Sequence, residues 1–120
     1  MLPQRTVLVV EDEPLILLGA SDMLESAGFQ VREAGNADQA MHILEVDRAI
    51  DILFTDVDMP GSMNGMGLAF EVSKRWPRIC IAITSGRWPA AREEIPAGAV
   101  FLDKPYLASS LVKALQGLTG

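Results

Sequence analysis

Residues 7–12 read Val-Leu-Val-Val-Glu-Asp, an apolar, β-branched run that ends in two carboxylates. Polar residues follow three later apolar runs in the same way: Asp56 after residues 52–54, Thr84 after residues 79–83, and Lys104 after residues 100–102. Open parallel α/β sheets place their chemistry beyond the carboxyl ends of the strands. We therefore expect three carboxylates, one hydroxyl and one ammonium to converge on one edge of a sheet.

Strand-like and helix-like patterns alternate along the whole chain of 120 residues. Strands are expected at about residues 6–10, 30–33, 51–55, 79–84 and 99–102. Helices are expected to begin near residues 14, 37, 67 and 107, with Asn36 as an N-cap and Gly28 as a C-cap. This alternation predicts an α/β fold, a doubly wound parallel sheet with helices on both faces. The length suits a single domain over residues 1–120.

Apolar residues at helical spacing predict which faces of the first and last helices are buried. In the first helix they are Ile16, Ala20, Met23, Leu24 and Ala27. In the last helix they are Leu107, Leu111, Leu115 and Leu118. Both sets are expected to pack against the sheet.

The segment between the fourth and fifth strands has weak helical signals. Pro89 and Pro96 bracket it, so any helix there spans only about residues 90–95. Two turns at most are marginally stable without packing. The sequence therefore predicts a shortened fourth helix, and residues 86–96 as the least ordered part of the domain.

The composition limits the function classes. Hydrophobic residues make up 49% and charged residues 22%, which argues against disorder. A net charge of −6 argues against direct binding of nucleic acid through a basic face. A single cysteine, Cys80, and the lack of an apolar run of transmembrane length favour a cytoplasmic protein with no membrane attachment.

The residue types at the expected edge favour phosphoryl chemistry with a metal. Crowded carboxylates repel one another unless a cation joins them, and oxygen ligands without His or Cys favour Mg²⁺. Asp12 and Asp56 would hold the ion, with Glu11 acting partly through water. Asp56 would be the nucleophile that carries the phosphoryl group. Lys104 would supply a point charge, and Thr84 a hydroxyl donor, to the phosphoryl oxygens.

Four segments resemble the receiver domain of two-component response regulators: residues 7–13, 56–61, 83–86 and 101–106. The resemblance covers essentially the whole chain. It implies a flavodoxin-like, five-stranded parallel sheet in the order 2-1-3-4-5 with five helices. It also implies a signalling switch that assists its own phosphorylation and dephosphorylation, and not a metabolic enzyme.

The resemblance implies a role for each acidic residue. Asp56 is the phosphoacceptor, which takes the group from a phosphohistidine on a sensor histidine kinase or a histidine phosphotransfer protein. Glu11, Asp12 and Asp56 surround Mg²⁺, and Asp58 gives it a backbone carbonyl. A downstream protein target is implied as the second partner, and the resemblance also allows a homodimer.

The resemblance assigns the remaining polar groups to readout. Thr84 and Lys104 bind the phosphoryl group, and Phe101 resembles the switch aromatic that rotates inward when Thr84 moves to the phosphate. The Lys104–Pro105 bond is expected to be cis. Since the fourth helix is expected to be short, the rearranged surface should centre on Arg87, Trp88, Phe101 and Tyr106.

Two spacings depart from the common receiver pattern. Gly65 lies 65 − 56 = 9 residues past the expected acceptor, one later than in many receivers. Thr84 and Lys104 are separated by 104 − 84 = 20 residues, about two fewer than usual, and the shortening falls on the usual output surface. These departures leave the chemistry intact and put the mode of readout in doubt.

Two alternatives remain at this stage. A flavodoxin-like binding protein would need a phosphate-cradling loop after the first strand, where this chain has the acidic run 11–13. A degenerate receiver would serve only for docking or dimerisation, and the presence of Asp56, Thr84 and Lys104 argues against it.

Overall fold

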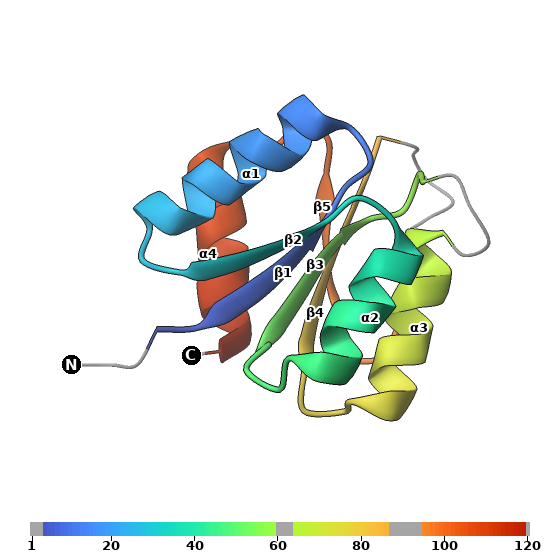
Figure 1. The fold of residues 1–120 in the computed structure, drawn as a ribbon. Helices are drawn as coiled ribbons and strands as arrows, with labels where there is room; N and C mark the ends of the chain where they lie inside the picture. The colour runs from blue at the N-terminus through green and yellow to red at the C-terminus, as the bar shows by residue number, and fades with distance from the viewer. Residues whose placement is uncertain (1–3, 60–63, 87–94, 120) are drawn as a thin grey trace.

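The computed structural model describes residues 4–59, 64–86 and 95–119, and its five strands form one parallel sheet in the order β2-β1-β3-β4-β5 (Figure 1). The strands are β1 (Thr6–Val10), β2 (Gln30–Ala34), β3 (Ile52–Asp56), β4 (Cys80–Ser85) and β5 (Val100–Asp103). The helices of the described residues are α1 (Pro14–Ser26), α2 (Ala37–Val46), α3 (Gly65–Arg75) and α4 (Ala108–Thr119). The predicted fold class and strand order are confirmed. The short helix expected near residues 90–95, and the low order expected around it, fall largely on residues 87–94, which lie outside the described part of the chain.

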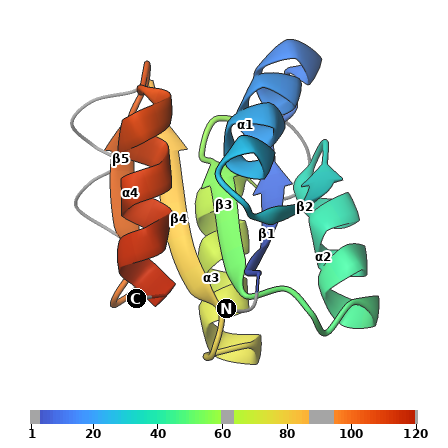
Figure 2. The same cartoon turned by 90° about the vertical axis from the view of Figure 1, so that its left-hand side faces the viewer.

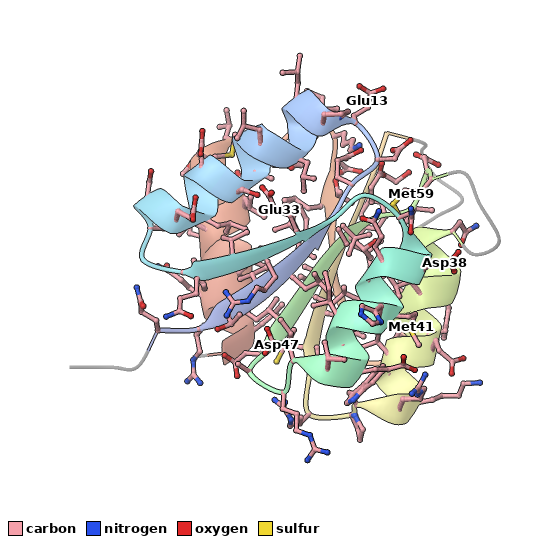
Figure 3. All side chains as sticks on the ribbon, in the orientation of Figure 1. Glu13, Glu33, Asp38, Met41, Asp47 and Met59 are labelled. Carbon is pink, nitrogen blue, oxygen red and sulfur yellow. The ribbon has the colours of Figure 1, made fainter. Side chains whose placement is uncertain are left out.

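The helices cover the two faces of the sheet in pairs. α1 and α4 lie on one face, and α2 and α3 on the other (Figures 1 and 2). Every residue of β1 is buried, as expected of a central parallel strand, and its side chains alternate between the two cores: Leu8 faces α2 and α3, whereas Val7 faces α1 and α4. A polar contact also fixes α1 to the sheet, since the hydroxyl of the buried Ser21 donates to Glu33 of β2 at 2.6 Å. Figure 3 shows Glu33 between β2 and α1. No helix of the described residues is long and apolar enough to cross a lipid bilayer.

Local signals set the helix ends. The Asn36 side chain accepts the Gln39 amide at 2.8 Å, which confirms the predicted N-cap of α2. Gly28 adopts φ 98° after α1, a backbone conformation that glycine accepts without strain. α3 begins two residues earlier than predicted because Asn64 caps it, accepting the Gly67 amide at 2.9 Å. This early start brings the first turn of α3 against the end of β3.

The predicted apolar faces are only partly buried. Ala20, Leu24, Leu111 and Leu115 lie in the core, as expected. The expectation was wrong for Ile16, Ala27 and Leu107, which are exposed, Leu107 by 71%. Helical spacing alone places these residues near the core stripe, but all three lie at the ends of their helices: Ile16 in the first turn of α1, Ala27 just after α1 and Leu107 just before α4.

Candidate functional site

The strand register brings the acidic and hydroxyl residues to one edge of the sheet. Asp56 ends β3 and pairs with Thr84 of β4, while Glu11 and Asp12 follow the last residue of β1 next to β3. Asp56 and Thr84 are each 3% exposed, and Glu11 is 5% exposed. Three separate segments of sequence therefore meet at the carboxyl ends of the central strands, as the sequence predicts.

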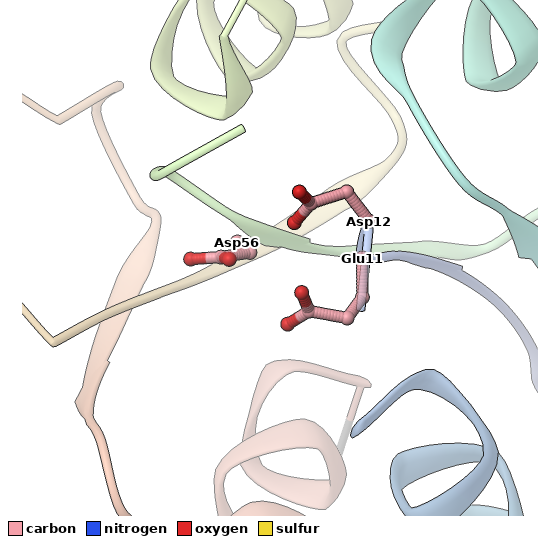
Figure 4. A group of neighbouring side chains, drawn as sticks. All are labelled: Glu11, Asp12 and Asp56. Carbon is pink, nitrogen blue, oxygen red and sulfur yellow. The ribbon is translucent and has the colours of Figure 1, made fainter. Parts of the chain in front are cut away.

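Three carboxylates share one space at this edge. Glu11, Asp12 and Asp56 each offer an oxygen atom, and these atoms lie within 4.8 Å of one another (Figure 4). Glu11 and Asp56 are buried, whereas Asp12 is exposed, so the group opens toward solvent on one side. Hard oxygen ligands with one open side suit Mg²⁺, which keeps several waters when bound to protein.

The pKa of Glu11 reflects its burial in this group. Burial raises the pKa of its carboxyl, and the negative charge of Asp56 adds to the rise. The backbone amide of Glu13, at 3.1 Å, and the Lys104 ammonium oppose that rise without cancelling it. A further cation beside Glu11 would favour its ionised form.

Lys104 is the cation that already reaches the group. Its ammonium lies 3.1 Å from Glu11 Oε1 and 3.1 Å from Asp56 Oδ2. Burial alone would lower the pKa of Lys104, but the hydrogen bonds and charges of Asp56 and Glu11 outweigh it and raise that pKa. Lys104 is therefore charged at neutral pH. The Lys104–Pro105 bond is cis, as expected.

Thr84 differs from its neighbours because its hydroxyl is buried and has no hydrogen-bond partner within the described residues. Its backbone is well fixed, since its carbonyl accepts the Val57 amide at 2.9 Å. A buried, unpaired hydroxyl has lost its water without gaining an acceptor. The Thr84 side chain is thus ready to donate to an acceptor placed beside Asp56.

The loop after β3 is tied to the site by Asp58. Its amide donates to Asp56 Oδ1 at 3.1 Å, and its own carboxylate accepts the Ser85 hydroxyl at 3.0 Å. Gly65 lies close by, where a Cβ atom would come within 1.7 Å of the Asp56 carbonyl oxygen. Despite its late position in the sequence, Gly65 thus occupies the point of close approach between α3 and β3.

The aromatic residues fall into different surroundings. Phe101 pairs with Ile83 across β4 and β5 and is half-buried against the core beneath α2 and α3. Tyr106 packs edge-on against Phe54, with ring centroids 5.7 Å apart, which favours core packing over a role as a partner anchor. Burial raises the pKa of the Tyr106 hydroxyl. Trp88 lies outside the described residues.

The sequence reasoning missed Ser85. This buried serine ends β4 and contacts Asp58, which follows the neighbouring strand β3, yet in the sequence it is only the residue after Thr84. The one available signal was the position of Ser85 at the end of a predicted strand, beside the other polar residues.

The sequence of the chain is similar to a known protein family and to several of its members. A family model described as response regulator receiver domain matches residues 7–116. The chain is 36% identical to the sensor kinase CckA of Brucella abortus, over 92% of the chain and 12% of the kinase. It is 33% identical to the chemotaxis protein CheY of Thermotoga maritima, over 92% of the chain and 94% of that protein. The chain thus spans a small part of the first relative and nearly all of the second.

Solved structures show the same similarity in three dimensions. A response regulator receiver protein from Sinorhizobium medicae has a TM-score of 0.87 and 28% identity, covering 98% of this chain and 96% of that one. The receiver domain from the hybrid histidine kinase CckA has a TM-score of 0.81 and 28% identity, covering 96% of this chain and 99% of that one.

Proposed function

The chain belongs to the response regulator receiver family of two-component systems, and we propose from this premise that it is a signalling switch phosphorylated on Asp56. We propose that residues 1–120 act as one receiver domain. A single observation carries the proposal. The buried Asp56 carboxylate forms a possible metal site with Glu11 and Asp12, and it lies with the charged Lys104 and the Thr84 hydroxyl at one edge of the sheet.

The proposed reaction is transfer of a phosphoryl group from a phosphohistidine of a sensor kinase or a phosphotransfer protein. An Asp56 carboxylate oxygen attacks phosphorus, a P–O bond forms, the P–N bond breaks, and the imidazole leaves with its electron pair. Asp58 holds one Asp56 oxygen through its amide, which orients the carboxylate. Lys104 moves from Asp56 Oδ2 to a phosphoryl oxygen and neutralises charge there. Downstream, we propose a protein target and no direct nucleic-acid contact, in line with the net charge of −6.

Mg²⁺ fits the residues present. Glu11, Asp12 and Asp56 would hold the ion. The Asp58 backbone carbonyl, which the family resemblance assigns to the metal, would be a further ligand. When bound, it would neutralise the oxygens of the transferred group. Burial raises the pKa of Glu11, and the charge of Asp56 adds to the rise, so a cation bound there would offset both by favouring the ionised carboxylate.

The proposed switch runs through β4 to β5. The Thr84 hydroxyl donates to a phosphoryl oxygen and gains the acceptor it lacks. Its movement vacates space beside the neighbouring strand, and Phe101 rotates into that space. The register supports this path because Ile83, the residue before Thr84, is the direct neighbour of Phe101.

We place the donor's docking surface on α1. Leu15 and Leu18 are 81% and 54% exposed on this helix. A largely apolar cavity of about 480 Å³ lies on the same helix, lined by Ile16, Met23 and residues 104–106. Since Lys104 lines this cavity and also contacts Asp56, a donor domain seated there would bring its phosphohistidine to the acceptor.

Intact-mass measurement tests the proposal. Incubation with Mg²⁺ and acetyl phosphate should add one phosphoryl group to the parent protein. No adduct is expected with Asp56→Asn or after chelation of the metal. Equal labelling of the variant would overturn the acceptor assignment, and a parent protein that never labels would favour a docking module without phosphoryl chemistry.

A further inference from the structure

We propose that Ser85 is a positioning residue for the metal loop, which we define as residues 57–59 after β3. The inference rests on the proposed function, because it concerns how the Asp58 backbone is presented to the metal. Ser85 does not contact the reacting atoms in this proposal. It acts through Asp58.

The hydrogen bonds around Asp58 carry the inference. Ser85 is 2% exposed, and its hydroxyl donates to Asp58 Oδ2 at 3.0 Å. The amide of Asp58 donates in turn to Asp56 Oδ1 at 3.1 Å. The side chain and the amide of Asp58 are thus fixed by different residues, and this leaves its backbone little freedom to turn.

Ser85 also fixes the opposite side of the site. Its carbonyl accepts the Lys104 amide at 3.1 Å, while the carbonyl of Thr84 accepts the Val57 amide at 2.9 Å. The last two residues of β4 therefore hold both the metal loop and the start of the Lys104 turn. Of these contacts, only the one from the Ser85 hydroxyl depends on the side-chain type.

The direction of the Asp58 carboxylate explains why the hydroxyl matters. Glu11, Asp12 and Asp56 form the described carboxylate group, and Asp58 is not part of it. A fourth carboxylate turned into that group would add repulsion in the absence of metal. By accepting from Ser85, the Asp58 carboxylate is held on the β4 side, which leaves its backbone carbonyl as the group to face the ion.

The test is a double-mutant cycle on Mg²⁺ affinity, measured by titration calorimetry on the full chain. Ser85→Ala should weaken Mg²⁺ binding by about three- to tenfold, less than the full effect of one hydrogen bond to a charged group, because the bond acts on the ion only through the Asp58 backbone. In an Asp58→Ala background the same change should have a much smaller effect on Mg²⁺ binding, since the bond between Ser85 and Asp58 is already lost. Ser21→Ala is the matched control, because Ser21 is also buried and also donates to a carboxylate, at 2.6 Å, away from the site.

The outcomes separate this inference from the proposed function. If the parent protein binds Mg²⁺ and is labelled by acetyl phosphate, but Ser85→Ala binds the ion equally well, only the role of Ser85 is overturned. An equal loss of Mg²⁺ affinity in Ser21→Ala would show that the effect of Ser85→Ala comes from reduced stability of the whole domain, and it would also overturn the role of Ser85. If the parent protein binds no Mg²⁺, the metal site of the proposed function fails and this inference fails with it. Faster hydrogen exchange at the amides of residues 58 and 59 in Ser85→Ala would support the positioning role independently.

Discussion

The two sides of the site differ in how completely their polar groups are paired. On the β1–β3 side, Lys104 lies 3.1 Å from both Glu11 and Asp56, and backbone amides hold the remaining oxygens of those carboxylates. On the β4 side, the Thr84 hydroxyl is buried without a partner among the described residues. The comparison teaches that the groups proposed for chemistry are assembled in advance, whereas the group proposed for readout gains its partner only when a phosphoryl group is present.

Removing the cation of the assembled side should have the largest effect on stability. Lys104→Ala leaves two buried carboxylates without the ammonium that contacts both. We expect the free energy of unfolding at neutral pH to fall by about 2–4 kcal/mol. This loss is smaller than for a fully buried ion pair, because the Lys104 side chain is partly exposed to solvent. Urea denaturation measures this loss, and Lys113→Ala on the exposed part of α4 is the control.

The pH dependence of the Lys104→Ala loss sharpens the comparison. The pKa of Glu11 is already raised above 4.5 by burial and by the charge of Asp56, and it should rise further without Lys104. When a carboxyl has a higher pKa in the folded state than in the unfolded state, the free energy of unfolding increases as the pH falls through the folded-state pKa toward 4.5. The same contribution is lost as the pH rises again. The deficit of the variant should therefore shrink between neutral pH and pH 4.5, and Mg²⁺ at neutral pH should also reduce it. A deficit that is constant with pH would mean that lost packing, and not unpaired charge, causes it.

Disturbing the contact between α3 and β3 should have the next largest effect. Gly65→Ala places a methyl group 1.7 Å from the Asp56 carbonyl oxygen, so α3 must shift. We expect a loss of about 1–3 kcal/mol in the free energy of unfolding, typical of overpacking, with weaker labelling of Asp56. Gly117→Ala is the matched control, since a Cβ there meets nothing within 4 Å, and it should stabilise α4 by about 0.5–1 kcal/mol. Equal stability of the two variants would show that α3 tolerates the shift.

The smallest stability effect is expected at Thr84. Thr84→Val removes a hydroxyl that has no partner to lose, so the free energy of unfolding should change by less than about 1 kcal/mol. The same variant should still bind Mg²⁺ and beryllofluoride, a mimic of the phosphoryl group. The mimic should no longer shift the NMR signals of Phe101. Persistence of those shifts would break the proposed link between Thr84 and Phe101.

The sequence predicted the convergence of the site but not the contacts that fix it. Asp56, Thr84 and Lys104 could be placed because each follows a short apolar run, and parallel strands end at a common edge. The exposure of Leu107 could not be predicted, since helical spacing does not fix where a helix begins, and α4 begins one residue later, at Ala108. The contact between Ser85 and Asp58 was equally hidden, because a side-chain hydrogen bond between a strand end and a loop depends on tertiary distances that no local pattern encodes.

The register between β3, β4 and β5 sets how far a signal has to travel. Asp56 is the direct neighbour of Thr84, and β5 is the next strand beyond it. Adjacent strands lie about 4.8 Å apart, so the whole path from acceptor to sheet edge is about 10 Å. The proposed rotations of Thr84 and Phe101 span that distance without the movement of a whole helix. A signal at Asp56 would then reach the last strand of the sheet through two neighbouring strands, and the partner that reads it could bind close to the acceptor itself.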